Sequence, residues 1–248
     1  MTAPPTPTLH VLTHIWAADI AWIERAALRR GLAVVIVSPA TGRPLPEPAH
    51  VERAIVLGGP MSADDVAAHP FLSDERGWLR TLVTNDTPVL GICLGSQLLA
   101  IALDGRVEPG KHGPEVGYID IMGVPGGNHP LAEALPGRHF SFHTDVSLPP
   151  EGAELLARSD RYPQAWSLGS ALALQFHPEL SPAGVSHLVA HEGPNLTEIG
   201  LDGKDLIAAS RKHEPTGTAK AEQILGGWLD LTPPQPITPG RGSRRTHR

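Results

Sequence analysis

The sequence contains one cysteine among 248 residues and no excess of positive charge. One cysteine can form neither an internal disulfide nor a cysteine-rich zinc site, which is typical of a protein in the reducing cytoplasm. The formal net charge of −6 gives no electrostatic reason to expect binding to nucleic acid or to an anionic membrane. No stretch is long and apolar enough to span a bilayer, and residues 1–8 lack the basic and apolar regions of a secretory signal. We therefore expect a cytoplasmic protein that acts on neither nucleic acids nor membranes.

The first hundred residues alternate short apolar runs with segments of helical periodicity. The apolar runs predict strands over 9–13, 32–37, 54–57 and 87–92. The periodic segments predict helices over 16–27, 73–83 and 94–103. The strand over 32–37 is β-branched and apolar on both faces, as a buried parallel strand requires. This order predicts an α/β fold with an open, mostly parallel sheet that is flanked by helices.

Between residues 106 and 176 the pattern changes to short strands that follow one another with turns between them. These strands are predicted over 116–121, 138–142, 154–157 and 171–176. A series of this kind predicts an antiparallel extension at the edge of the parallel sheet.

The C-terminal part carries weaker signals. A helix is predicted over 182–190, after which the pattern fades. We therefore expect one domain over residues 1–195 and an extension over 196–248, with one helix at 219–229 and disorder beyond it. The extension ends in a basic stretch, 241–248, whose Pro/Gly-rich surroundings favour a solvated tail over a binding arm.

Cys93 stands where a predicted strand meets a predicted helix, in Gly91-Ile-Cys-Leu-Gly95. A nucleophile on such a turn is held in a strained conformation with its side chain exposed, and glycines two residues before and after it relieve the crowding. The helix N-terminus favours negative charge and so stabilises a thiolate. Lowering a thiol pKa from about 8.5 to about 7 takes roughly 2 kcal/mol, which a helix terminus and a nearby imidazolium can supply. The motif is equally compatible with a tight turn that carries a buried, unreactive cysteine.

A second segment, Leu174-Gln-Phe-His-Pro-Glu-Leu180, ends an apolar strand and places His177 and Glu179 two residues apart. Positions i and i+2 of extended backbone share a face, so the carboxylate can orient and polarise the imidazole. Such a pair keeps one ring nitrogen protonated and directs the other at Cys93. Alone, the triplet is a common surface turn. Together with the cysteine turn it favours a Cys-His-Glu triad.

A third segment, Val56-Leu-Gly-Gly-Pro-Met-Ser62, follows another strand. Adjacent glycines let backbone N–H groups approach a ligand closely. The N–H groups of Gly59 and Leu94 together would form an oxyanion hole, in which one donor is typically worth about 3–4 kcal/mol in the transition state. On its own, Gly-Gly-Pro also fits a simple turn.

These three segments, in this order, resemble the class I (triad) glutamine amidotransferases, and most of all the stand-alone proteins similar to the amidotransferase domain of GMP synthetase. The resemblance covers about residues 50–180. It implies a flavodoxin-like core, a catalytic triad of Cys93, His177 and Glu179, and an oxyanion hole from the backbone of Gly59 and Leu94.

The resemblance also implies a substrate pocket. Gln97, one turn along the helix that follows the cysteine, matches the family position that helps to bind glutamine. Gly58, His143 and Asp145 are the other residues expected to line or support the pocket. Thr144 departs from the small residue, such as Gly, that family members usually carry before that Asp.

The chemistry that the resemblance implies is hydrolysis of the side-chain amide of glutamine. The thiolate attacks the amide, His177 protonates the leaving ammonia, and water activated by His177 hydrolyses the γ-glutamyl thioester. No metal or organic cofactor is needed. Because the sequence shows no P-loop or similar ATP motif, we expect a separate synthase to receive the ammonia. Two alternatives stay open: a free-standing γ-glutamyl hydrolase or peptidase with the same triad, and a catalytically silent regulatory partner.

The other histidines show no spacing that a metal site would demand. His187 and His191 lie four residues apart on a predicted helix, but no third ligand is evident. We expect surface or internally satisfied polar roles, and no metal site, for His10, His14, His69, His112, His129, His187 and His191.

Overall fold

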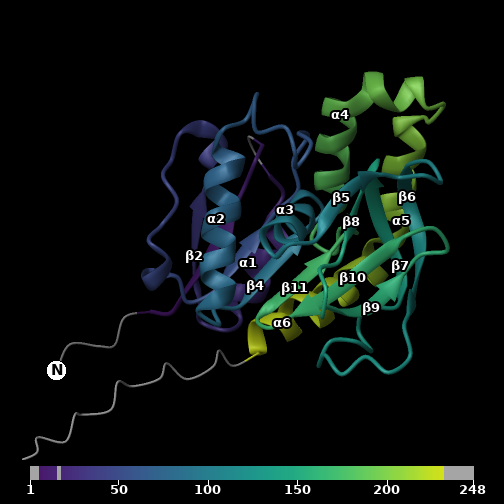
Figure 1. The fold of residues 1–248 in the computed structure, drawn as a ribbon. Helices are drawn as coiled ribbons and strands as arrows, with labels where there is room; N and C mark the ends of the chain where they lie inside the picture. Colours follow the sequence, from purple (N-terminus) through teal and green to yellow (C-terminus); the bar gives the residue numbers. More distant parts are fainter. Residues whose placement is uncertain (1–5, 16–17, 232–248) are drawn as a thin grey trace, which may run out of the picture.

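A nine-stranded mixed sheet forms the centre of the computed structural model, which describes residues 6–15 and 18–231 (Figure 1). One half of the sheet is parallel, in the order β2-β1-β3-β4-β11. Its strands are β1 (Thr8–Leu12), β2 (Ala33–Val37), β3 (Ala54–Val56), β4 (Val89–Ile92) and β11 (Ala171–Leu174). The predicted α/β fold with a mostly parallel sheet is confirmed.

The sheet continues beyond β11 through antiparallel neighbours, in the order β10-β9-β6-β7. These strands are β10 (Pro163–Leu168), β9 (Glu154–Arg158), β6 (Glu115–Gly123) and β7 (Gly137–His143). A separate antiparallel pair consists of β5 (Arg106–Pro109) and β8 (Asp145–Leu148). The predicted antiparallel extension is therefore present, and β5, β8 and β10 are additions to the predicted strands. The strand predicted over 171–176 within that extension is instead β11, which pairs parallel with β4 and antiparallel with β10.

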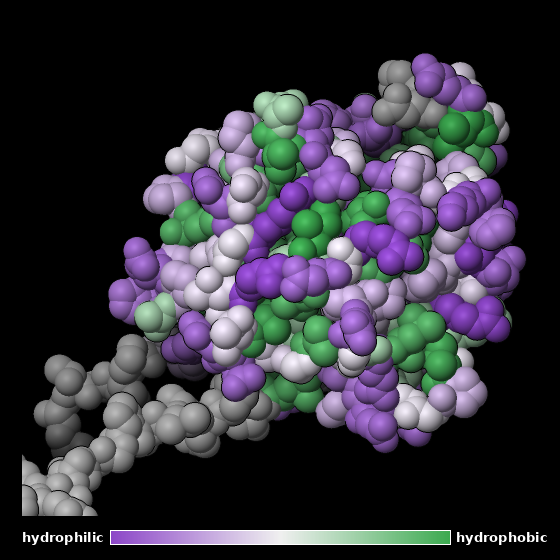
Figure 2. All heavy atoms as spheres, viewed as in Figure 1, coloured by the Kyte–Doolittle hydropathy of each residue, from purple (hydrophilic) through white to green (hydrophobic). Residues whose placement is uncertain are grey.

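Helices cover both faces of the parallel half. The chain forms α1 (Ala21–Leu28), α2 (Phe71–Thr84), α3 (Leu94–Ala102), α4 (Pro182–Glu198), α5 (Gly203–Ala221), a π-helical turn η3 (Glu222–Gly226), α6 (Gly227–Asp230) and two 3-10 turns, η1 (Pro39–Thr41) and η2 (Pro48–His50). One buried cluster joins α2 and α3 to the sheet. A second joins α1, η3 and α6 to the opposite face. Polar side chains cover much of the surface in Figure 2, with apolar residues gathered in separate places between them.

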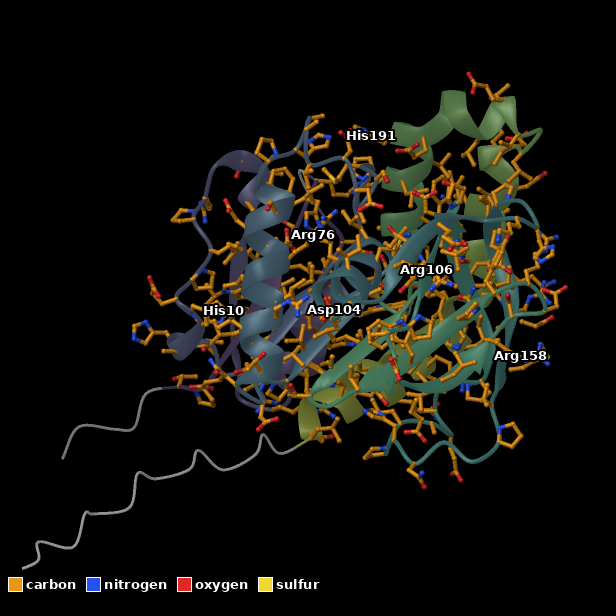
Figure 3. All side chains as sticks on the ribbon, in the orientation of Figure 1. His10, Arg76, Asp104, Arg106, Arg158 and His191 are labelled. Carbon is orange, nitrogen blue, oxygen red and sulfur yellow. The ribbon has the colours of Figure 1, made fainter. Side chains whose placement is uncertain are left out.

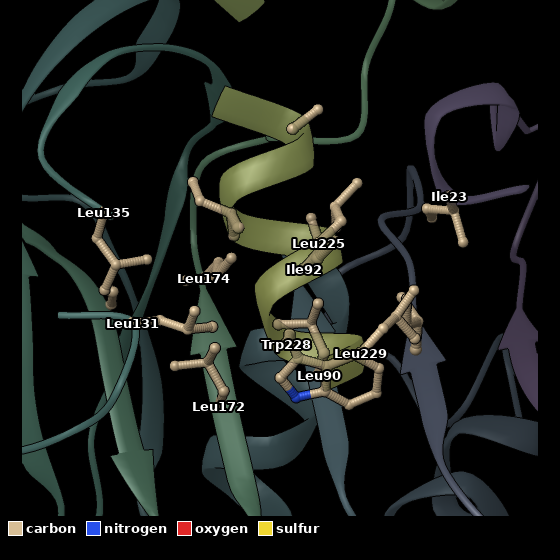
Figure 4. Close-up of a cluster of buried hydrophobic side chains, with 14 of the residues drawn as sticks. Ile23, Leu90, Ile92, Leu131, Leu135, Leu172, Leu174, Leu225, Trp228 and Leu229 are labelled. Atoms are coloured by element: carbon tan, nitrogen blue, oxygen red, sulfur yellow. The ribbon is translucent and has the colours of Figure 1, made fainter. Parts of the chain in front are cut away.

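The C-terminal helices pack into the same core as the sheet. Figure 4 shows Leu225, Trp228 and Leu229 beside Ile92 of β4 and Leu174 of β11. The predicted helix at 219–229 is thus the end of a longer helical run from 203 to 230, and the expected boundary at residue 195 falls inside α4. Two predicted features lie outside the described residues. They are the basic stretch, which is part of residues 232–248, and Trp16 of the first predicted helix. Within the described ranges, every helix is too short or too polar to cross a membrane.

Candidate active site

Cys93 lies at the junction of β4 and α3 with a backbone that non-glycine residues rarely adopt. Its φ is 53° and its ψ is −108°. The Cys93 N–H donates to the carbonyl of Leu174 on the neighbouring strand β11 (2.8 Å), and the Cys93 carbonyl accepts from the N–H groups of Ser96 (3.0 Å) and Gln97 (3.1 Å). These hydrogen bonds hold the strained turn, and backbone strain of this kind persists where the surrounding structure enforces it. The expectation of an exposed side chain is wrong, because Cys93 is only 8% exposed and lines the cleft from a buried position.

The glycines on either side of the cysteine turn are required by close packing. A Cβ atom on Gly95 would collide with the carbonyl oxygen of Val56 in β3. A Cβ atom on Gly91 would lie 2.5 Å from the carbonyl oxygen of Gly95. No side chain fits at such distances, so the strand–helix turn needs glycine at both positions.

The sheet topology brings Cys93 and His177 to the same edge. Strands β4 and β11 are parallel neighbours with Ile92 opposite Leu174, so both chains leave the sheet in the same direction. A Cβ atom built on Gly58 would lie 3.1 Å from Cε1 of His177 and 3.9 Å from Sγ of Cys93. The two side chains therefore face one shared space beside Gly58, although they are far apart in the sequence.

His177 is held by its backbone and by a carboxylate. Its N–H donates to the carbonyl of Phe140 (2.8 Å), and its ring Nδ1 donates to Oε1 of Glu179 (2.7 Å). Both side chains are buried. Burial lowers the pKa of His177, but the Glu179 carboxylate and Cys93 outweigh it and raise the pKa to about 10. The ring is therefore an imidazolium near neutral pH.

The Gly58–Gly59 loop follows β3 and lies beside Cys93. The N–H of Leu57 donates to the carbonyl of Leu12 (3.0 Å), which fixes the loop to β1. A Cβ atom on Gly59 would lie 2.8 Å from Cδ2 of Leu94, so the two predicted oxyanion-hole residues are in close contact. Leu94 is the first residue of α3, where backbone N–H groups lack helical partners and can bind an anion.

The remaining predicted pocket residues form one hydrogen-bonded group. Gln97 donates from Nε2 to the carbonyl of Asp145 (3.2 Å), and Nδ1 of His143 lies 3.1 Å from the same oxygen. The Asp145 carboxylate accepts from the Ser62 hydroxyl (3.3 Å). The hydrogen bond of Gln97 thus connects α3 to β8. Asp145 lines the cleft.

His143 is oriented by a buried glutamate on the neighbouring strand. Its Nε2 donates to Glu115 (3.1 Å), and the same carboxylate oxygen accepts from Nε2 of Gln164 (2.7 Å). Burial raises the pKa of Glu115, but the hydrogen bonds from His143 and Ser159 outweigh it and hold that pKa below its usual range. Both ring nitrogens of His143 are occupied by protein groups, so this residue supports the pocket from behind.

A cleft of about 990 Å³ opens over these groups. Its lining includes all of the predicted side chains, namely Cys93, Gln97, His143, Asp145, His177 and Glu179. It also includes two groups that sequence analysis missed: His14, and the face of α4 that carries His187, Leu188 and His191. Figure 3 places His191 on the side of α4 that faces the N-terminal half. No group of three or more His, Cys, Asp or Glu in the described residues is arranged to hold a metal ion.

Comparisons with known proteins agree with this arrangement. The family model "Glutamine amidotransferase class-I" matches residues 19–190. The chain belongs to the class-I glutamine amidotransferase family. The amidotransferase fold is also found in a glutamine amidotransferase from Thermotoga maritima (TM-score 0.83, 24% identity, 92% of this chain and 100% of that one). A glutamine amidotransferase from Methylobacillus flagellatus has the same fold (TM-score 0.79, 21% identity, 98% of this chain and 99% of that one).

Similar sequences include a GMP synthase and a GMP synthase subunit. The glutamine-hydrolyzing GMP synthase of Thermomicrobium roseum is 37% identical over 131 residues, which is 51% of this chain but only 23% of that protein. One subunit of the glutamine-hydrolyzing GMP synthase of Halobacterium salinarum is 31% identical over 159 residues, or 60% of this chain and 78% of that one. The chain therefore spans about a quarter of the first relative and most of the second.

Proposed function

We propose that this amidotransferase hydrolyses the side-chain amide of glutamine through a thioester on Cys93 and delivers the ammonia to a separate synthase. The proposal is supported above all by the imidazole of His177, which faces Cys93 on one side and is bonded to Glu179 on the other. A cysteine at a strained strand–helix turn, activated by an oriented imidazolium, is suited to attack on a carbonyl carbon.

The first half of the reaction uses the thiolate–imidazolium pair. The Cys93 thiolate attacks the amide carbon of glutamine, and the developing oxyanion accepts hydrogen bonds from the N–H groups of Gly59 and Leu94. His177 transfers its proton to the amide nitrogen, and the C–N bond breaks to release ammonia. A γ-glutamyl thioester remains on Cys93.

The second half returns the enzyme to its starting state. Neutral His177 takes a proton from water, and the resulting hydroxide attacks the thioester carbon. The C–S bond breaks, glutamate leaves, and the imidazolium again faces a thiolate. Glu179 keeps its charge throughout and holds the ring in one orientation, as the acid of other catalytic triads does.

Delivery of ammonia to a partner is supported by the relatives. Two of them are named as a GMP synthase subunit and as a carbamoyl phosphate synthase small chain, so each is one chain of a larger synthase. The present chain contains no P-loop for activating an acceptor. The partner we propose is therefore a synthase that binds beside the cleft.

The test is a direct assay of glutamine hydrolysis. Ammonia and glutamate are measured for the wild type and Cys93→Ala, alone and with candidate synthases co-purified from the source cells. Equal release of both products by the wild type, and none by Cys93→Ala, supports the proposal.

Two results would favour a different function. Faster hydrolysis of γ-glutamyl amines than of glutamine would favour a free-standing γ-glutamyl hydrolase. No labelling of Cys93 by a glutamine-mimicking chloroketone, with no turnover of either substrate, would favour a silent regulatory partner.

A further inference from the structure

A buried histidine–glutamate pair lies behind the Gly58–Gly59 loop. His14 follows β1 and Glu75 lies on α2, and the Nε2 atom of His14 is 3.2 and 3.1 Å from the two oxygens of Glu75. Both side chains are fully inaccessible to solvent. The other ring nitrogen, Nδ1, lies 3.3 Å from the carbonyl oxygen of Gly58. The ring thus bridges a helix of the core to the loop beside Cys93.

The contacts of His14 determine its protonation. Each ring nitrogen faces an oxygen that can only accept, so both contacts are hydrogen bonds only when both nitrogens carry protons. A neutral ring would turn a lone pair toward the carbonyl of Gly58 or toward Glu75. Burial lowers the pKa of His14, but Glu75 and the carbonyls of Gly58 and Leu57 outweigh it and raise that pKa. The contacts and the raised pKa therefore both favour the protonated form of the His14 ring beside Glu75.

The hydrogen bond to Gly58 fixes a peptide plane that also carries the Gly59 N–H. In a trans peptide the C=O and N–H bonds point in opposite directions. The Gly58 carbonyl points at His14, so the Gly59 N–H points away from it. A Cβ atom on Gly59 would lie 2.7 Å from Cβ of His14, so the histidine packs directly against this peptide. Rotation of the peptide would break the bond to His14.

We propose that His14, oriented by Glu75, is a positioning residue that holds the Gly58–Gly59 peptide with the Gly59 N–H directed at the substrate oxygen. This inference rests on the proposed function, because an oxyanion hole has a purpose only if an acyl group is transferred. The pair stabilises the transition state through the loop and does not touch the substrate. A buried ion pair is a weak source of net stability, so stability alone gives little reason for it.

Two double variants test the inference with a matched comparison. His14→Phe/Glu75→Leu removes the ion pair and the donor to Gly58, while apolar side chains refill the space. His14→Asn/Glu75→Leu removes the same charges but keeps an amide N–H near the position of Nδ1. We expect the kcat of the Phe variant to fall roughly 100-fold, since one oxyanion-hole donor is worth about 10²–10³ in kcat. The Asn variant should retain at least ten times the kcat of the Phe variant, and KM should change less than threefold in both.

Alkylation and unfolding measurements distinguish a misplaced Gly58–Gly59 peptide from a general loss of structure at the active site. Iodoacetamide displaces iodide without forming an oxyanion, so its rate with Cys93 reports the thiolate alone. We expect both variants to react within threefold of the wild type and to unfold cooperatively. Equal kcat in the two variants, or wild-type kcat in the Phe variant, would overturn the inference. If the wild type itself releases no ammonia from glutamine, the proposed function fails instead.

Discussion

Nδ1 of His177 lies 2.7 Å from Oε1 of Glu179, and both side chains are buried beside Cys93. The carboxylate is only two residues further along the chain, on a segment that continues from β11. This short connection fixes which ring nitrogen is bonded to the acid and which faces the cleft. It also sets the charge of the imidazole, from which the first prediction follows.

Glu179→Gln should lower kcat for glutamine by up to about 10⁴-fold, the loss seen when the acid of a serine-protease triad becomes an amide. Glu179 and Cys93 raise the pKa of His177 to about 10, so the amide should let that pKa fall. Less imidazolium then remains at pH 8, and iodoacetamide should alkylate Cys93 more slowly there than in the wild type. Unchanged alkylation and unchanged kcat would show that Glu179 does not govern the imidazole.

Gly95→Ala should destabilise the fold by more than about 2 kcal/mol, because the new Cβ would collide with the Val56 carbonyl and force α3 away from β3. Gly77→Ala in α2 is the matched control. A Cβ there meets nothing within 4 Å, so the change should stabilise the helix by about 0.5–1 kcal/mol. Denaturant unfolding of both variants measures the difference. Equal changes in unfolding free energy for the two variants would contradict the close packing of Gly95 against Val56.

His139 should make stability fall in mild acid. Burial is the main cause that lowers its pKa to about 4, and Lys220 contributes in the same direction. Its folded pKa is below the unfolded value, so below pH 6.5 the unfolded chain binds a proton that the folded chain does not. This costs about 2 kcal/mol between pH 7 and pH 5.

The check is His139→Phe, which keeps an aromatic ring beside Phe176. Its unfolding free energy should change less between pH 7 and pH 5 than that of the wild type. If the unfolding free energies of the two proteins fell by the same amount between pH 7 and pH 5, His139 would not be the group responsible.

Trp228→Ala should cost about 3–5 kcal/mol, the range for truncating a buried aromatic side chain. Trp228 is 2% exposed and packs with the parallel half of the sheet (Figure 4). Leu28→Ala on α1 is the control, because Leu28 is 78% exposed and should cost less than about 0.5 kcal/mol. Chemical unfolding of the two variants tests whether the C-terminal helices belong to the core. A small loss at Trp228 would show that they do not.

The parallel half of the fold was predictable because its signals are local. β4 is an apolar run buried along its whole length, and the glycines around Cys93 mark the turn after it. The antiparallel strands were harder to predict. β10 contains the buried Gln164, whose amide bonds to Glu115 of β6, so a polar residue interrupts the apolar pattern that predicts a strand.

The C-terminal helices were underestimated for a different reason. α5 contains Pro215 and Gly217, and α4 contains Gly193 and Pro194, residue types that usually interrupt a helix. Packing overrides these residues, since Leu206 and Ala221 of α5 are buried. His14 was assigned a surface or satisfied role, because its partner Glu75 lies 61 residues away and no local pattern joins them.

β11 joins the two halves of the sheet, since it is parallel to β4 and antiparallel to β10. It is also among the last strands to be synthesised, so a nascent chain that already displays Cys93 still lacks its imidazole neighbour. During synthesis the cysteine turn therefore precedes its imidazole neighbour, and the site is complete only once the segment through Glu179 has joined β4.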